Sequence, residues 1–177
     1  MWSSRNENVW KGVAYNSAMM VQWALDFLEG WRCANEVAVV SGVSLNVEQW
    51  RKPQAGRIKL NTDASVRQGK SRMGLGWVLR DDRGRFMAAK NVLATGNYLV
   101  KEVEALCVWE ALSWLKVENV KDLASEIGDV EFNFVKRSAN CAAHYVAREA
   151  FSMSGCGEWL DSPPSFLVNV LHSDSMN

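Results

Sequence analysis

The strongest strand signal in this chain is at residues 56–65, which read Gly56-Arg57-Ile58-Lys59-Leu60-Asn61-Thr62-Asp63-Ala64-Ser65. The other predicted elements are placed relative to this segment. Ile58, Leu60 and Thr62 alternate with polar residues, which is the two-residue period of a strand with one face on a core. The polar face ends in the carboxylate of Asp63. We therefore predict a strand that presents Asp63 to the elements packed beside it.

Two more strands are predicted directly after this one. Residues 73–80 are mainly apolar and include Gly74 and Gly76, residues 81–84 read Asp-Asp-Arg-Gly, and residues 85–89 form another largely apolar run. An apolar run, a polar turn with glycine and a second apolar run are typical of a hairpin. The three strands are therefore expected to be consecutive and antiparallel.

Amphipathic helices are predicted before and after these strands. The later helix covers residues 99–116, and its apolar face consists of Val103, Leu106, Cys107, Ala111 and Trp114. The earlier helix lies within residues 1–48, and its stripe consists of Met20, Trp23, Ala24, Phe27, Leu28 and Trp31. We interpret residues 1–48 as a helical leader and linker, residues 49–160 as the domain and residues 161–177 as a C-terminal tail. An alternative is that the tryptophans of the leader pack on the domain or form a partner-binding face.

A last strand and a last helix are predicted near the end of the domain. Val130, Phe132 and Phe134 alternate with polar residues, as in a half-buried strand. Ser138 or Asn140 can cap the following helix. The apolar face of that helix consists of Ala143, Val146, Ala147, Ala150 and Phe151.

Composition limits the classes of protein that fit this chain. Hydrophobic residues make up 48% of the sequence, and the formal net charge is zero, so any nucleic-acid binding depends on a local basic patch. No apolar run approaches the roughly 20 residues that span a bilayer. The four cysteines are far apart, which favours reduced thiols. We expect a soluble intracellular protein without a membrane partner, nuclear or cytoplasmic.

Residues 50–160 resemble the ribonuclease H-like domain of plant non-LTR retroelement polyproteins and their domesticated relatives. The resemblance rests on W-x-x-P and G-x-I-K-L-N-T-D-A-S, at residues 50–53 and 56–65, and on G-x-G-W-V-L-R-D-x-x-G-R-F, at residues 74–86. It continues through residues 104–106 and 137–140. The resemblance implies an α/β fold in which a mixed sheet is flanked by helices.

The resemblance also implies an activity and a site. Relatives are RNA–DNA hybrid ribonucleases that hydrolyse phosphodiesters with Mg²⁺ or Mn²⁺ held by converging carboxylates. Asp63 and Glu104 match the first two catalytic carboxylates and are the implied metal ligands. His144 stands at the position of the fourth carboxylate, as in the plant branch of the family, and Arg137 and Asn140 are implied to contact the substrate. His144 can equally be a partly buried histidine with a structural partner.

The sequence departs from the family pattern between about residues 116 and 122. The fourth strand, which carries the third carboxylate and would pair in parallel with the first strand, is missing together with most of the following helix, and so is the third carboxylate. Glu118 and Asp122 are candidates for its role by residue type only. The fold is therefore expected to be incomplete and cleavage to be impaired.

Two other interpretations stay open at this point. The chain could be a binding module that holds an RNA–DNA hybrid or other nucleic acid without cutting it. It could also be a non-functional retroelement remnant or the product of a truncated gene model. The sequence identifies no particular protein partner and gives no oligomeric state.

Overall fold

The computed structural model describes residues 48–67, 71–117, 131–153 and 155–175. In chain order the elements are β1 (Lys59–Val66), β2 (Arg72–Arg80), β3 (Phe86–Thr95), α3 (Val100–Val117), the 3-10 turn η1 (Arg137–Ala139), α5 (Cys141–Glu149), β4 (Gly157–Leu160) and α6 (Ser165–Ser175). The chain divides into two compact units, residues 1–43 with 112–134 and residues 44–111 with 135–177. The site described below lies in the second unit. The predicted N-terminal helix lies outside the described residues.

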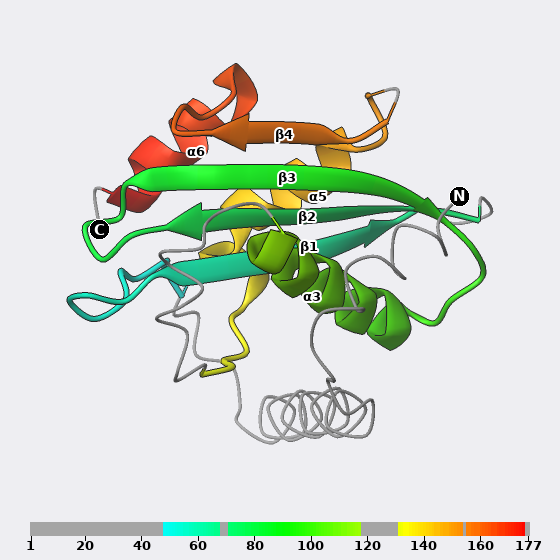
Figure 1. Cartoon of the computed structure of the whole chain (residues 1–177), viewed down its shortest axis with the longest axis horizontal. Coiled ribbons are helices and arrows are strands. Elements are labelled where there is room, and N and C mark those ends of the chain that lie inside the picture. The colour runs from blue at the N-terminus through cyan, green and yellow to red at the C-terminus, as the bar shows by residue number, and fades with distance from the viewer. Residues whose placement is uncertain (1–47, 68–70, 118–130, 154, 176–177) are drawn as a thin grey trace. The chain divides into compact units, whose positions relative to one another are not determined.

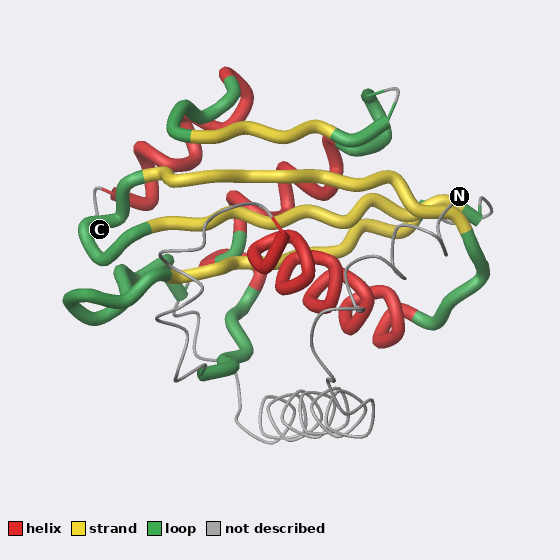
Figure 2. The backbone as a smooth tube through the Cα atoms, in the orientation of Figure 1, coloured by secondary structure: helices red, strands yellow, loops and turns green. Residues whose placement is uncertain are grey.

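The described strands form one sheet in the order β1-β2-β3-β4, and Figure 2 shows β1 and β4 at its opposite edges. All three pairings are antiparallel. The prediction of three consecutive antiparallel strands is confirmed, and so is the helix predicted over 99–116, which is α3. No described strand runs parallel to β1, so the parallel part of the expected mixed sheet is not seen there. The departure from the family pattern was expected between about residues 116 and 122, and residues 118–130 lie outside the described part, so the missing strand stays a prediction.

The strand predicted at 130–134 is wrong for its described residues. Residues 131–136 have no regular secondary structure, and the side chains of Phe132 and Phe134 are exposed. The late strand of the sheet is instead β4, whose four residues pair with residues 88–91 of β3. An alternating pattern becomes a strand only where a neighbouring strand supplies hydrogen-bond partners, and the alternation itself carries no information about that neighbour.

The segment expected as a C-terminal tail contains a helix that packs on the sheet. Leu167 of α6 is fully buried in a cluster with residues of β2, β3 and α5, namely Val78, Ala89, Ala142 and Val146. Phe166 of the same helix stacks edge-on against Trp159 of β4. Residues 165–175 thus contribute to the core of this unit.

Helix α5 lies directly on β2 because β2 offers glycine at the point of contact. A Cβ atom built on Gly74 would come within 2.0 Å of the Ala147 carbonyl oxygen, and one on Gly76 within 2.2 Å of the Ala147 nitrogen. The helix meets them with small residues, Ala143, Ala147 and Ala150, all fully buried. This backbone-to-backbone approach brings the side chains of α5 close to β1.

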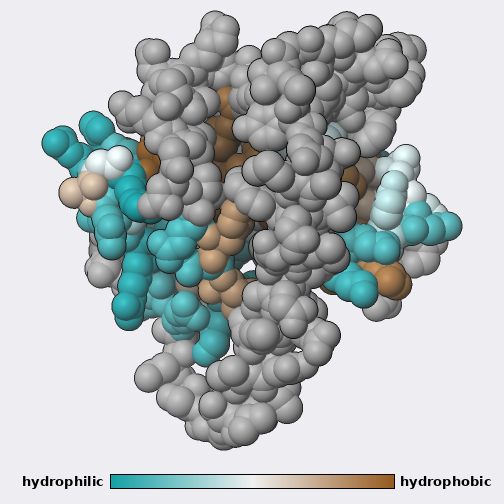
Figure 3. Space-filling view, turned by 60° about the horizontal axis from the view of Figure 1, so that its bottom comes forward, coloured by the Kyte–Doolittle hydropathy of each residue, from teal (hydrophilic) through white to brown (hydrophobic). Residues whose placement is uncertain are grey.

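Helix α3 lies on the other face of the sheet, as Figure 1 shows. Alternation along β2 turns Met73, Leu75 and Trp77 away from α5, and all three are buried. On α3, Val103, Cys107 and Ala111 are also buried, and the Cys107 thiol lies 3.6 Å from the Gly76 carbonyl oxygen of β2. Where described side chains are visible in Figure 3, hydrophilic ones predominate. The sheet is thus covered on both faces, and β1 is an edge strand between the two helices.

Candidate functional site

Asp63 lies in the middle of β1, and its carboxylate is in contact with α5. Oδ2 of Asp63 forms a hydrogen bond of 2.8 Å with Nδ1 of His144. Both side chains are mostly buried, with 14% of Asp63 and 18% of His144 exposed. Burial raises the pKa of Asp63, while the hydrogen bond and charge of His144 and the charge of Arg137 oppose that rise. The two residues form a carboxylate–imidazole pair with limited access to water.

Glu104 approaches the same place from α3. Burial, and next the negative charge of Asp63, raise the pKa of Glu104 to about 7, and the positive charge of Arg137 partly opposes them. The negative charge of Asp63 thus acts on the carboxyl of Glu104, and the facing of the two side chains stays a prediction. Cys107, one turn after Glu104, fixes this end of α3 on β1, because its thiol donates a hydrogen bond of 3.1 Å to the carbonyl oxygen of Asp63.

Arg137 supplies positive charge beside the two carboxylates. It lies in η1, immediately before α5, and is exposed to solvent. Its positive charge partly opposes the rise in the pKa of both Asp63 and Glu104. Arg137 is therefore an exposed cation whose charge reaches both carboxylates.

Asn140 directly precedes α5 and was predicted as a possible cap of this helix. Its side chain makes no capping hydrogen bond. Its Nδ2 donates to the carbonyl oxygen of Thr62 at 2.8 Å, and its Oδ1 accepts from Nδ2 of Asn61 at 3.0 Å. The amide oxygen and nitrogen are thus both engaged within the protein. The cap was predicted from residue type, and the contact with β1 is made across 78 positions of sequence, beyond the reach of a local pattern.

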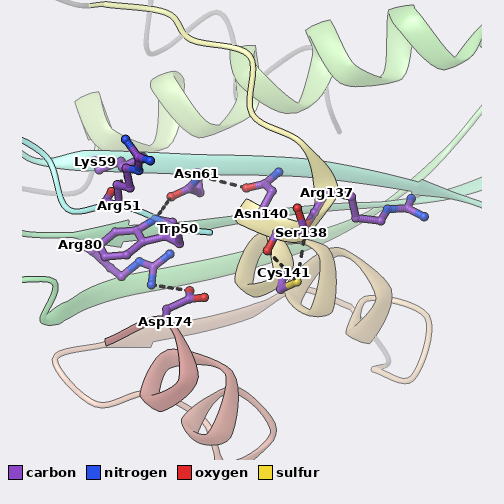
Figure 4. A network of polar contacts seen from close by, with 10 residues as sticks. All are labelled: Trp50, Arg51, Lys59, Asn61, Arg80, Arg137, Ser138, Asn140, Cys141 and Asp174. Carbon is purple, nitrogen blue, oxygen red and sulfur yellow. Dashed lines mark hydrogen bonds and ion pairs between the residues drawn. The ribbon is translucent and has the colours of Figure 1, made fainter. Parts of the chain in front are cut away.

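Asn61 and Trp50 are functional candidates that sequence reasoning missed. Trp50 Nε1 donates to Oδ1 of Asn61 at 2.9 Å, and both side chains are buried (Figure 4). The guanidinium of Arg80 lies over the Trp50 ring, 3.5 Å from its centroid, and forms an ion pair of 2.7 Å with Asp174 of α6. The available signal was the alternation along β1, which puts Asn61 on the same face as Asp63.

The described donor set matches a metal centre only in part. Asp63 and Glu104 are the two carboxylates, and the described residues contain no group of three or more His, Cys, Asp or Glu side chains arranged to hold a metal ion. His144 is bonded to one oxygen of Asp63, and imidazole suits softer metals better than magnesium. A pair of Mg²⁺ ions requires more oxygen ligands than these two carboxylates supply. The described residues therefore do not fit a two-metal site.

Part of the chain matches a model of a known protein family. The model of the reverse transcriptase-like family matches residues 61–116, a segment that includes Asp63 and Glu104 but ends before Arg137, Asn140 and His144. Comparisons with curated proteins and with solved structures found no match. None of the helices in the described residues is long and apolar enough to cross a bilayer. The resemblance inferred from the motifs is thus confirmed over residues 61–116 at the level of the family, and this segment of the chain is similar to reverse transcriptase-like proteins.

Proposed function

We propose that residues 49–160 with α6 form a ribonuclease H-like domain that binds nucleic acid, RNA–DNA hybrid in particular, and in which metal-dependent cleavage is impaired. The observation that carries this proposal is the arrangement around Asp63. The charge of Asp63 raises the pKa of Glu104, the other carboxylate of the matched segment, and Asp63 itself is bonded to the imidazole of His144. Plant retroelement origin and the internal deletion are part of the same proposal.

Binding would rest on the phosphate backbone, with Arg137 as the first contact. An exposed guanidinium beside buried acids can hold a phosphate in front of Asp63 and Glu104. The pKa of about 7 for Glu104 supports this role, because a protonated Glu104 removes one negative charge that would repel the phosphate. A hybrid duplex would further be recognised through its shape and its 2′-hydroxyl groups.

Cleavage would require ions at Asp63 and Glu104, the residues implied to hold Mg²⁺ or Mn²⁺. When bound, such ions supply activation of water and neutralisation of the leaving oxygen. The chain's own contribution is to orient the two carboxylates from β1 and α3 and to hold His144 against Asp63. Because the donor set of the described residues falls short of a two-metal site, we expect binding without substantial product formation.

The test is fluorescence anisotropy with a labelled RNA–DNA hybrid in Mg²⁺, followed by denaturing gels on the same samples. We expect salt-sensitive binding, no cleavage product, and a log–log salt slope reduced by about 1 in Arg137→Ala. The matched control is Arg148→Ala, an exposed arginine in the last turn of α5. Magnesium-dependent cleavage that disappears in Asp63→Asn but persists in Asp161→Asn, at the opposite edge of the sheet, would overturn impairment. Equal salt slopes in the two arginine variants would overturn the binding surface.

A further inference from the structure

We infer that Asn140 is a positioning residue that holds His144 against Asp63, through a buried chain of hydrogen bonds that begins at Trp50. This inference rests on the proposed function, since it explains how the site is kept in shape. It assigns to Asn140 a role different from the direct substrate contact that the family resemblance implies.

The chain of contacts is continuous and shielded from water. It runs from Trp50 Nε1 to Asn61 at 2.9 Å, from Asn61 to Asn140 at 3.0 Å, and from Asn140 to the Thr62 carbonyl at 2.8 Å. Trp50, Asn61 and Asn140 are between 2% and 8% exposed. Figure 4 shows Asn61 and Asn140 pointing toward each other between β1 and the start of α5. Hydrogen bonds between buried polar groups have no water to replace them, so each one restricts geometry strongly.

The spacing of these residues connects the contact to the site. Asn61 lies two positions before Asp63 in β1, so the two side chains share one face of the strand. Asn140 lies four positions before His144, one helical turn, and its carbonyl accepts a hydrogen bond of 3.1 Å from the His144 backbone nitrogen. The Asn61–Asn140 bond therefore fixes the register between the strand that carries Asp63 and the helix that carries His144.

The far end of the chain of contacts is itself anchored. The Trp50 ring stacks on the guanidinium of Arg80, which is 1% exposed and paired with Asp174. Trp50 cannot turn away without exposing that buried charge, so it offers Asn61 a fixed donor. The network thus runs from α6 through β2 and β1 to the beginning of α5.

Asparagine is the residue type that this position requires. Asn140 donates to one β1 group and accepts from another with a single planar amide, whereas aspartate would place an oxygen against the Thr62 carbonyl. Alanine would leave the Asn61 amide and the Thr62 carbonyl without Asn140 as a partner. Either substitution should loosen the pairing of His144 with Asp63, although Asn140 touches neither carboxylate of the site.

The test measures the effect of Asp63 on His144 by NMR. The chain has two histidines, so the imidazole signals of His144 and of His172 on α6 can be followed separately. In the wild-type background, Asp63→Asn should shift the His144 imidazole signals and leave those of His172 in place. In an Asn140→Ala background, the same Asp63→Asn change should shift His144 several-fold less, and Trp50→Phe should give an intermediate reduction.

Asn91→Ala is the matched control for loss of a buried asparagine. Asn91 also bridges the sheet and α5, since its Nδ2 donates to the Val146 carbonyl at 3.3 Å. It lies on β3, however, and β2 separates it from Asp63 on β1. We expect Asn91→Ala to lower stability and to leave the Asp63-dependent shift of His144 unchanged. An undiminished shift in Asn140→Ala, or an equal reduction in Asn91→Ala, would overturn the inference. If Asn140→Ala does not fold, Trp50→Phe decides: it keeps the ring over Arg80 and removes the donor to Asn61, and an undiminished shift there overturns the inference.

This readout separates the inference from the proposed function. If the hybrid does not bind but the Asp63-dependent shift is lost in Asn140→Ala, the function fails and the positioning role stands. If the hybrid binds with the expected salt slope but Asn140→Ala leaves the shift intact, the positioning role fails alone.

Discussion

The α5 side of β2 presents Gly74, Gly76 and Val78, whereas its α3 side presents Met73, Leu75 and Trp77. On the α5 side a helix backbone rests on glycine, and buried polar groups are bonded across elements, as between Asn61 and Asn140. On the α3 side β2 presents large apolar side chains, and all of them are buried.

This difference suggests a division of roles between the two faces. Apolar packing between large side chains can adjust to small changes of volume, so the α3 side should tolerate substitution. Backbone contact and buried hydrogen bonds have little freedom, so the α5 side should fix the position of the helix on the sheet more closely. The candidate site lies where the second kind of packing reaches β1.

The largest loss of stability should come from adding a side chain at a glycine of β2 on which α5 packs. In Gly76→Val the new side chain collides with the backbone of Ala147, and we expect a loss of more than about 3 kcal/mol in the free energy of unfolding. Leu75→Val, the neighbouring position on the α3 side, should lose only about 1 kcal/mol. Urea unfolding followed by circular dichroism measures both, and equal losses would contradict the division between the faces.

The next effect concerns the ion pair beneath Trp50. Asp174→Ala leaves the guanidinium of Arg80 buried without its partner, and we expect a loss of about 3 kcal/mol. Thermal unfolding of the variant measures the loss. A Tm equal to that of the wild-type chain would show that α6 is not held by this pair.

A pH-dependent effect is expected at Glu104. A carboxyl whose pKa is raised from 4.5 to about 7 on folding keeps its proton in the folded state over that range, so its contribution to stability is lost as the pH rises. Glu104→Gln should therefore unfold like the wild type near pH 4 and be more stable by about 2 kcal/mol near pH 8. Unfolding curves at the two pH values test this, and a gain of equal size at both would contradict the shift.

The smallest effect should come from the ion pair on the α3 side. Lys90 and Glu158 have the same 2.7 Å distance as Arg80 and Asp174, but 15% and 29% of their side chains are exposed. Glu158→Ala should cost about 1 kcal/mol or less, because water and salt screen the pair. A loss as large as that of Asp174→Ala, in the same thermal assay, would show that burial does not distinguish the two pairs.

The local parts of the fold could be predicted because their signals are local. The alternation in residues 58–63 and the turn at 81–84 concern neighbours in sequence, and helix α3 follows from its own apolar stripe. The alternation at Phe132 and Phe134 was equally regular, yet those residues form no strand. Strand formation depends on an available edge, and β4 occupies the edge of β3.

The candidate site could be predicted in its residues but not in its contacts. The motifs pointed to Asp63, Glu104, Arg137, Asn140 and His144, but gave no information on how Asn140 and His144 would be engaged. Asn61 and Trp50 carried no motif signal of their own. Their importance arises from hydrogen bonds that span 79 and 11 positions, which no periodicity reports.

The sequence by itself determined the hairpins and the amphipathic helix α3, and it singled out Asp63 and Glu104 as the candidate carboxylates. Each of these depends on residue types a few positions apart. Only the tertiary structure decided that α5 rests on Gly74 and Gly76, that Asn140 bonds to β1 instead of capping its helix, and that His144 meets Asp63. The physical reason is that these contacts require two backbones to approach closely in space, and the approach is set by how all the elements pack together.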